Sequence, residues 1–502
     1  MIKKEEPEPL LSKHQIEPSS SGIILCANIP ARYTIAIWAF FGFFCLYAMR
    51  VNLSIAIVAM VARQSALNKS IEACPIIEKN STKSSTKYEF DWNPSKAGLI
   101  LGAFFYGYIT TQVIGGNLAE KIGAKWIFGG GILISSILTL LTPLAARIHY
   151  KLLIVIRVIM AFPSAAALWA KWIPVSERST VPPTAQTGIS MGIIFTTPLV
   201  SIMAANGFLG GWPSAFYVFS MVIIRNKIII FLSLGIISCI WFIGWCFFGF
   251  NSPNEHPRIS EKERIFLCKY IHPNPQKHRA TPWNKIACCA PLYGIAIMHV
   301  CYNFIYDTLL TTLPTYFATI LNFNLQQNGF IFALPYFVQF LITIIVGPLI
   351  DRLRVRKTFS ITALRKTQTI IGTVGTCGLL ISIGYMGCNQ FPAVLCCILA
   401  VGFLGLQTCG ALISHLDIAS NYAGTLVGIT NTLGTIPSFV GPYIVGAITN
   451  NNQTIKAWRL IFNISAGIGA FGCLAYCILF NGEEQSWNRI EHEDDTIESA
   501  KS

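Results

Sequence analysis

The amino-acid sequence predicts an all-α membrane protein with twelve transmembrane helices, arranged as two pseudo-symmetric halves of six helices each. Three observations lead to this prediction. Only 12% of the residues are charged while 53% are hydrophobic, a balance that cannot cover the surface of a soluble protein of this length. The hydrophobic residues come in blocks of about 20, the length of helix that crosses the hydrocarbon core of a bilayer. In addition, two motifs recur at corresponding places in the two halves of the chain.

Hydropathy places six spans in each half, and each must be helical because lipid offers backbone groups no hydrogen-bond partners. In the first half the spans lie near residues 33–60, 97–118, 124–145, 151–170, 185–206 and 214–250. In the second half they lie near residues 289–317, 328–350, 367–387, 391–413, 422–449 and 457–480. The chain then divides into an N-terminal cytoplasmic tail, a six-helix half, a cytoplasmic linker, a second six-helix half and a C-terminal cytoplasmic tail, at 1–30, 31–250, 251–288, 289–480 and 481–502. The first tail is polar, and we expect it to be disordered.

The basic residues predict how the helices are oriented. The loops 251–287 and 351–366 are rich in Lys and Arg, which indicates that they and both termini face the cytoplasm. Three glycosylation acceptors, Asn68, Asn80 and Asn452, all fall in loops on the opposite, lumenal or extracellular side. The net charge of +14 is therefore a consequence of topology. Because no basic stripe alternates with aromatic residues, we exclude nucleic acid as a partner.

Two further features bear on the resident membrane and on covalent cross-links. Glu6, Leu10 and Leu11 match an acidic dileucine sorting signal, which favours a lysosomal or endosomal membrane. A short acidic tail that contains two leucines by coincidence explains the match equally well, so the plasma membrane stays open. Cys74 and Cys388 lie in loops on the same predicted outer face. A disulfide between them is one option, although the sequence does not fix their distance.

An internal repeat supports the division into halves. The pattern Gly-x-Leu-x-acid-base follows both the second and the eighth span, and its candidate gating residues are Gly116, Glu120, Lys121, Gly123, Asp351 and Arg352. Trp and Phe four positions apart begin both the sixth and the twelfth span, as Trp212 with Phe216 and Trp458 with Phe462. Glycines let helices approach closely, and an acid at a helix end can pair with a base of the other half. We interpret the loop motif as a latch that breaks when the halves rock, the alternative being a tight turn with solvated charges.

Several stretches of the chain carry a family resemblance. They include Tyr47-Ala-Met-Arg50-Val-Asn52-Leu-Ser54, Phe105-Tyr-Gly-Tyr108, Trp169-Ala-Lys171-Trp172, Leu313-Pro-Thr-Tyr316, Tyr422-Ala-Gly424 and Gly482-Glu483. From Ala31 onward the chain resembles the anion:cation symporter family of the major facilitator superfamily, the group of sialin, the vesicular glutamate transporters and the type I sodium–phosphate cotransporters. It is most similar to sialin-like members and to insect phosphate-cotransporter-like members. The resemblance implies secondary active transport of small organic or inorganic anions, such as sialate, another acidic solute or phosphate, coupled to a proton or sodium gradient by alternating access.

Two arginines lie inside predicted spans, where a charge is costly and marks a functional site. Arg50 is in the first span beside the polar Tyr47, and its guanidinium offers a fork to carboxylate or phosphate. We therefore expect Arg50 and Tyr47 to bind the anion, the alternative being a structural arginine bonded to backbone carbonyls. Arg157 is in the fourth span, and the resemblance implies a role in anion transport. Its alternative is snorkelling toward the lumenal interface, because it closely follows Lys151.

The seventh span contributes Tyr302, Asn303 and Asp307 to the candidate site. Vesicular glutamate transporters resemble this region but carry an arginine where this chain has Tyr302, which argues against glutamate as the solute. We assign Tyr302 and Asn303 to substrate binding. Asp307 stands where the family has an aromatic residue, and a buried carboxyl can take up a proton. Asp307 is therefore our candidate proton relay, unless it is a local divergence without a function.

Two spans depart from the family pattern. The stretch from Arg157 to Trp169 is about six residues shorter, roughly 9 Å of helix, and both acidic positions that the resemblance implies are missing. In the sixth span, residues 221–232 look inserted. The alternative to a coupled carrier is therefore a fold-retaining but uncoupled or inactive paralogue, or a faulty gene sequence across residues 157–169 and 221–232.

The distribution of reactive side chains does not favour catalysis. Ser, His and Cys are scattered through the spans without nucleophile–base spacing or a metal-ligand cluster. We therefore expect no enzyme activity, no catalytic or metal-binding residues and no cofactor. The expected partners are a small anionic solute, a coupling proton or sodium ion and the lipid bilayer, and we expect the protein to act as a monomer.

Overall fold

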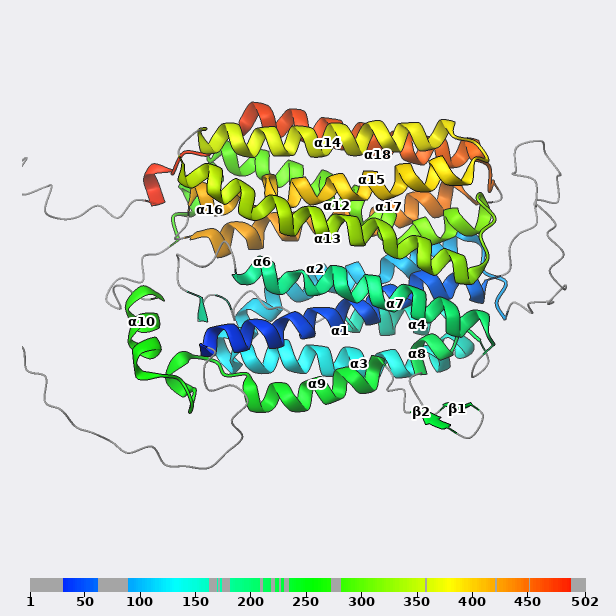
Figure 1. The fold of residues 1–502 in the computed structure, drawn as a ribbon, viewed down its shortest axis with the longest axis horizontal. Helices are drawn as coiled ribbons and strands as arrows, with labels where there is room; N and C mark the ends of the chain where they lie inside the picture. Colours follow the sequence, from blue (N-terminus) through cyan, green and yellow to red (C-terminus); the bar gives the residue numbers. More distant parts are fainter. Residues whose placement is uncertain are drawn as a thin grey trace, which may run out of the picture.

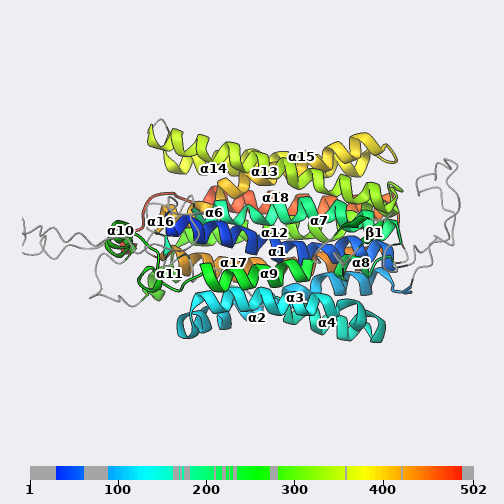
Figure 2. The same ribbon diagram turned by 60° about the horizontal axis from the view of Figure 1, so that its bottom comes forward.

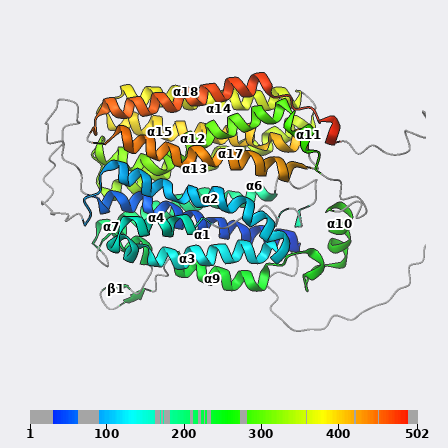
Figure 3. The same cartoon turned by 180° about the vertical axis from the view of Figure 1, so that it is seen from behind.

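The long helices lie side by side in two groups. In the computed structural model the described residues are 30–61, 89–161, 169, 172–173, 181–207, 211–217, 222–224, 227–229, 234–271, 281–356, 359–419, 422–450 and 452–488. Helices from the first half of the chain form one group and helices from the second half form the other (Figure 1). Seen from behind, the same two groups remain separate (Figure 3). The two predicted halves are thus two bodies of one bundle.

The N-terminal half contains α1 (Ala31–Met60), α2 (Pro94–Ile122), α3 (Ala124–Ile148), α4 (Tyr150–Ile159), α6 (Val181–Gln186), α7 (Gly188–Ala205), α8 (Ser214–Tyr217) and α9 (Leu234–Phe248). The linker contains η3 (Pro253–Glu255), α10 (Glu261–Ile271) and α11 (Trp283–Ala287). The C-terminal half contains α12 (Ala290–Thr319), α13 (Leu325–Val355), α14 (Ile361–Tyr385), α15 (Gln390–Cys409), η4 (Ala411–Ile413), α16 (Ser414–Ile418), α17 (Ala423–Ile448) and α18 (Ile455–Leu479), before η6 (Ser486–Asn488). Every predicted span contains one of these helices.

The helices have the length and composition of membrane spans. Within the described residues, seven helices are long and apolar enough to cross a bilayer: Ala31–Met60, Ala124–Ile148, Thr184–Ala205, Leu325–Ile350, Ile361–Tyr385, Gln390–Ile418 and Ile455–Leu479. A shorter apolar helix covers Ser238–Phe248. Large side chains such as Phe247, Phe391 and Ile478 are exposed on the bundle, where a soluble protein would carry polar groups. The chain is a multi-pass membrane protein.

The fourth and sixth spans are the irregular ones. Helix α4 ends at Ile159 after ten residues, about 15 Å of helix. The sixth span is divided into α8 and α9 by a hairpin of β1 (Val222–Ile224) and β2 (Lys227–Ile229), which pair antiparallel. Among the described residues this hairpin is the one β-sheet, and it lies beside the bundle rather than in it (Figure 1). Both irregularities fall on the stretches that the sequence marks as departures.

The repeated Trp and Phe pair confirms the predicted pseudo-symmetry. Trp212 and Phe216 have ring centroids 6.0 Å apart, and so have Trp458 and Phe462. All four side chains are buried. Both halves therefore bury a tryptophan and a phenylalanine four positions apart, with the rings inclined at 79° in the first pair and at 38° in the second.

The loops after α2 and α13 are anchored in equivalent ways. In the first half the backbone N–H of Lys125 donates to Asn251 Oδ1 at 3.0 Å, just beyond α9. Gly123 there has φ +105°, and a Cβ on it would lie 2.4 Å from the same Asn251 oxygen, so only glycine fits. In the second half the N–H of Gly482, beyond α18, donates to Thr362 Oγ1 at 2.9 Å. Each half ties the loop that carries the gating motif to the end of its own last helix.

The order of helices across the bundle places α1, α7, α12 and α17 toward its middle (Figure 2). Helices α2, α3 and α4 lie toward one edge and α13, α14 and α15 toward the other, with α1, α7, α12 and α17 between them (Figure 2). The halves meet through α2 against α17, α7 against α13, and α1 against α12. A side chain on the middle of α1 or α12 can therefore face the opposite half.

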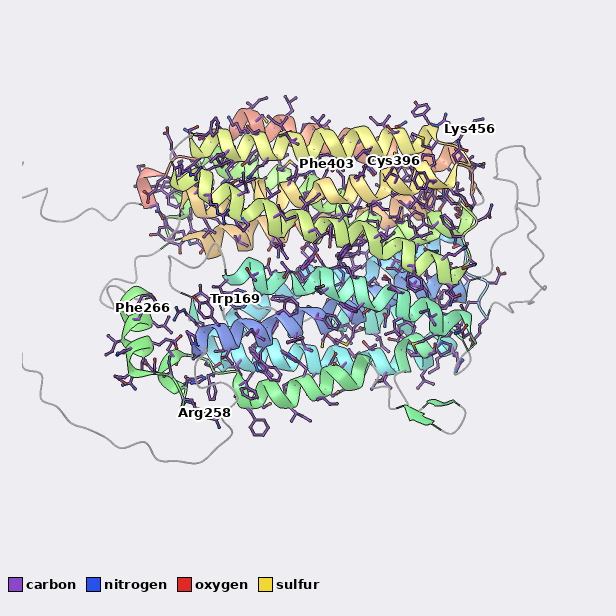
Figure 4. The ribbon with its side chains drawn as sticks, in the orientation of Figure 1. Trp169, Arg258, Phe266, Cys396, Phe403 and Lys456 are labelled. Atoms are coloured by element: carbon purple, nitrogen blue, oxygen red, sulfur yellow. The ribbon has the colours of Figure 1, made fainter. Side chains whose placement is uncertain are left out.

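The two ends of the bundle are identified by their loops. Arg258 and Phe266 of the linker lie at one end, the predicted cytoplasmic end, and Lys456 lies toward the other, which we call the outer end (Figure 4). At the outer end the halves are tightly packed. A Cβ on Gly98 of α2 would lie 2.5 Å from the Pro442 carbonyl oxygen of α17, and one on Gly329 of α13 would lie 1.9 Å from Ser201 Oγ of α7. Glycine permits this close approach.

The same face of α17 is open toward its cytoplasmic end. Gly424 and Gly428 lie at the helical spacing that continues toward Pro442, yet no heavy atom lies within 4 Å of a Cβ built on either glycine. The halves are therefore closed against each other at the outer end and separated along this part of α17.

Candidate functional site

An ion pair joins the two halves in the middle of the bundle. Arg50 Nη2 of α1 lies 2.6 Å from Asp307 Oδ1 of α12. Both residues are buried, with Arg50 9% and Asp307 6% exposed. The second carboxylate oxygen of Asp307 accepts a hydrogen bond from Ser438 Oγ of α17. Arg50, predicted to bind the anion, and Asp307, predicted to relay a proton, are therefore in direct contact.

Aromatic rings surround the Arg50 guanidinium. Its Nη1 donates to the Tyr47 hydroxyl at 2.9 Å. Its central carbon lies 4.4 Å from the ring centroid of Phe105, 4.8 Å from that of Tyr47 and 5.0 Å from that of Phe104. These distances are within the range of cation–π attraction. The rings shield the guanidinium from water and fix its direction. Its two terminal nitrogens contact Tyr47 and Asp307.

Arg157 is buried beside Arg50 but is not paired with an acid. It is 2% exposed, and its Nη2 donates to the Arg50 carbonyl oxygen at 3.0 Å. Its Nε and Nη1 are buried and have no hydrogen-bond partner among the described residues. The side chain points at α1 rather than toward the outer interface, so it does not snorkel. A buried guanidinium with two donors that lack a partner among the described residues is unfavourable by itself.

A small cavity connects the two arginines. It has a volume of about 10 Å³ and is lined by Arg50, Val51, Ser54, Leu101, Phe104, Phe105, Arg157, Leu310 and Thr311. The lining comes from α1, α2, α4 and α12, and therefore from both halves. Its polar atoms belong to two cations and two hydroxyl groups, while its walls are apolar. Such a space favours a small anion over a cation or a neutral solute.

Tyr302 and Asn303 lie on the same helix as Asp307 but bind within the C-terminal half. The Tyr302 hydroxyl lies 3.3 Å from Thr408 Oγ1 and accepts from Gln339 Nε2 at 3.4 Å. Asn303 Nδ2 donates to the Gly434 carbonyl oxygen at 2.9 Å. The Asn303 donor is thus used to hold α12 against α17. The structure brings Tyr47, Arg50, Arg157 and Asp307 together, and it places Tyr302 and Asn303 next to this group.

Ser438 is a site residue that the sequence reasoning missed. It completes a series of contacts between α12 and α17 in which both helices advance by four residues at each step: His299 with Thr430 at 3.3 Å, Asn303 with Gly434, and Asp307 with Ser438. The regular spacing keeps the Asp307 carboxylate in one position. A hydroxyl residue eight positions after Thr430, on the same face of the helix, was the available signal.

A second cluster, outside the spans, was also not predicted. At the outer end Glu89 Oε1 lies 2.7 Å from Arg147 Nε, and the Trp212 indole N–H donates to Glu89 Oε2 at 2.7 Å. The hydrogen bond from Arg147 lowers the pKa of Glu89. This contact ties the segment before α2 to the end of α3 and the start of α8.

The remaining candidate residues are placed only in part. Asn452 is exposed at the outer end, and Thr454 of the same acceptor sequence caps α18 through its hydroxyl. Arg352 is exposed. For Gly116 the structure describes only the backbone, and it does not describe the side chains of Glu120, Lys121 and Asp351. Five predicted residues lie wholly outside the described part of the chain: Glu6, Leu10, Leu11, Asn68 and Asn80. Cys388 is disulfide-bonded, and Cys74 is the partner that the sequence suggests.

Known proteins resemble the chain along almost all of its length. The family described as Major Facilitator Superfamily matches residues 39–226 and 227–442. Sialin from Homo sapiens is 37% identical over 487 residues, which cover 95% of this chain and 94% of that protein. Sialin from Ovis aries is 34% identical, covering 97% of this chain and 95% of that protein. Vesicular glutamate transporter 2 from Homo sapiens is 33% identical, covering 92% and 76% respectively.

Solved structures share the fold at much lower identity. A D-xylose–proton symporter superposes with a TM-score of 0.62 at 11% identity, covering 90% of this chain and 99% of that one. A xylose transporter from E. coli in a partially occluded, inward-open conformation gives a TM-score of 0.59 at 15% identity, covering 88% and 96%. These likenesses show that the chain shares the fold of these transporters.

Proposed function

The chain belongs to the major facilitator superfamily, and from this premise we propose that it is a secondary active carrier of small anions. It is a transporter of the group that includes sialin and the vesicular glutamate transporters, and not an enzyme. One observation carries the proposal: the guanidinium of Arg157, which has no acidic partner among the described residues, lies beside Arg50 in a small cavity between the halves.

Arg157 supplies the first contact with the solute. Its Nε and Nη1 have no hydrogen-bond partner among the described residues, and guanidinium N–H groups bind the oxygens of carboxylate and phosphate. Phe104 and Phe105 keep water from the bound group, so the attraction acts in a medium of low dielectric constant. Ser54 and Thr311 add hydroxyl groups to the same cavity. Arg50, with Tyr47 as its hydroxyl partner, is the second cation available to the solute.

Transport requires the site to be exposed to each side of the membrane in turn. The tight glycine contacts close the outer end, and the open face of α17 at Gly424 and Gly428 provides the cytoplasmic route. Rocking of the two halves about the α1–α12 contact would reverse this arrangement. In this proposal the gating motif of Gly116, Glu120, Lys121, Gly123, Asp351 and Arg352 latches the cytoplasmic end when the outer end opens. The driving force is a proton or sodium gradient.

The proposal includes the surroundings of the carrier. Glu6, Leu10 and Leu11 support a lysosomal or endosomal membrane, with the plasma membrane as the alternative, and Asn68, Asn80 and Asn452 support glycosylation on the outer side. We infer that the functional unit is a monomer, because the cavity is built from one chain. The alternative, an uncoupled or inactive paralogue or a faulty gene sequence, is not favoured, since relatives align over nearly the whole chain and both arginines face the cavity.

Uptake by the purified full-length chain in proteoliposomes tests the proposal. Labelled sialate, glutamate and inorganic phosphate are offered with and without an imposed pH or sodium gradient. We expect accumulation of one of these anions above equilibrium when a gradient is present. Uptake that only equilibrates would exclude coupling, and the absence of uptake for every anion would support the inactive alternative. Arg157→Ala should abolish uptake, while Arg264→Ala, at an exposed linker arginine, is the matched control.

A further inference from the structure

We propose that the Asp307 carboxylate is a tethered competitor of the transported anion: it occupies Arg50 in the empty carrier, and a proton must neutralise it before the solute's anionic group binds there. The inference rests on the proposed function and names the coupling ion as a proton and its acceptor as Asp307. It assigns the two arginines different tasks. Arg157 receives the solute, and Arg50 changes partner.

The contacts of Arg50 favour such an exchange. One terminal nitrogen contacts Asp307 and the other donates to Tyr47. The Asp307 carboxylate neutralises the guanidinium charge and would repel a second carboxylate or a phosphate at the same group. An anion therefore gains the full charge-assisted contact with Arg50 only when the Asp307 contact is broken. Breaking it with Asp307 still charged would leave a buried carboxylate without a cation, which is strongly unfavourable.

None of the described groups that face Asp307 competes with its carboxylate as a proton acceptor. They are Tyr47 and Arg50 of α1, Tyr302 and Tyr306 of α12 and Tyr336 of α13, while α17 contributes the neutral Ser438. None of them is a second carboxylate. The other buried acid that the structure describes in the spans, Asp417, is already bound by Arg365, with Nε and Oδ2 2.7 Å apart, and is not among the residues that line the cavity.

The exchange is balanced in atoms and charge. A proton from the acidic side forms an O–H bond on Asp307, the Arg50–Asp307 contact breaks, and the solute carboxylate or phosphate takes the position beside Arg50. One proton then moves with each anion. Because the coupling between two ligands is reciprocal, the bound anion also favours retention of the proton until the cavity opens to the other side. Loss of both together returns Asp307 to Arg50.

Asp307→Asn is the direct test, since the amide keeps the shape of the side chain but cannot release or take up a proton. The full-length carrier is assayed with labelled sialate and inorganic phosphate, by binding at a series of pH values and by counterflow exchange. In the wild type we expect affinity to fall as pH rises, by up to about tenfold per pH unit for one linked proton. In Asp307→Asn we expect affinity without pH dependence, retained counterflow and no accumulation driven by a pH gradient. Asp307→Glu should restore the pH dependence.

Ser438→Ala provides a second test if Asp307→Asn fails to fold. Removing the hydroxyl takes away a donor to the charged form of the carboxylate while the ion pair remains. The pH profile of anion binding should then shift to higher pH. A pH dependence that survives in Asp307→Asn, or binding by that variant that is weaker than wild type at every pH, would overturn the inference. No uptake of any anion by the wild type would instead overturn the proposed function, so the two failures are distinguishable.

Discussion

Replacing Arg50 with alanine leaves the Asp307 carboxylate buried without its counter-ion. Asp307 is 6% exposed, and its remaining polar contact is the Ser438 hydroxyl. Removal of one partner from a buried ion pair costs about 3–5 kcal/mol. Replacing both charges at once leaves no unpaired charge, so Arg50→Ala with Asp307→Asn should lose much less. The coupling energy of the pair is the difference between the double variant and the sum of the single variants.

The stability of the four proteins can be compared in detergent. Each is heated in steps, and the fraction that remains folded is measured by size-exclusion chromatography. We expect Arg50→Ala to melt at a clearly lower temperature and the double variant to recover most of the loss. If the single variant is as stable as the wild type, or if the two losses simply add, Arg50 and Asp307 do not depend on each other and the ion pair is not part of the folded core.

Three further predictions concern other contacts. Arg157→Lys should reduce the initial uptake rate at least tenfold although it keeps the charge, because the guanidinium fork is lost; wild-type rates in this variant would remove Arg157 from the site. The lowered pKa of Glu89 means that its ion pair stabilises the protein above the ordinary pKa of Glu, about 4.3, and that this stabilisation is lost as the pH falls through the lowered value. Glu89→Gln should therefore lower the melting temperature at pH 7, and the difference from wild type should shrink below about pH 4. Peptide mapping without reducing agent should link Cys388 to Cys74, and a link from Cys388 to another cysteine would contradict the sequence-based pairing.

The sequence predicted the helices well because lipid imposes a length and a composition on each span. The boundaries of α1, α12 and α18 agree with the hydropathy blocks within a few residues. The two motifs were sufficient to predict the halves, because a repeated packing unit repeats its residues. The hairpin between α8 and α9 could be recognised only as an irregularity, since short strands outside a bundle leave no hydropathy signal of their own.

The contacts inside the site were beyond the reach of the sequence. Arg50 and Asp307 are 257 positions apart, and their contact depends on which faces α1 and α12 present after the halves have packed. The same holds for Ser438, whose role follows from its position opposite Asp307 on α17. The sequence also could not predict that Nε and Nη1 of Arg157 lack a hydrogen-bond partner among the described residues, because this depends on every neighbour of the guanidinium.

The positions of the acids explain why the shortened fourth span need not abolish coupling. The family resemblance implies carboxylates that follow the arginine of this span, and their absence agrees with an Arg157 that has no acidic partner among the described residues. The same resemblance implies an aromatic residue where this chain carries Asp307, and that carboxylate contacts the other cavity arginine. Both implied acids are thus absent beside Arg157, and one acid is present beside Arg50, with the cavity between them. A buried ion pair is costly to desolvate and gains little over apolar packing, so stability alone does not account for the Arg50–Asp307 pair. A proton on Asp307 would control access to Arg50, and we therefore propose a carrier whose coupling group lies on α12 rather than on α4.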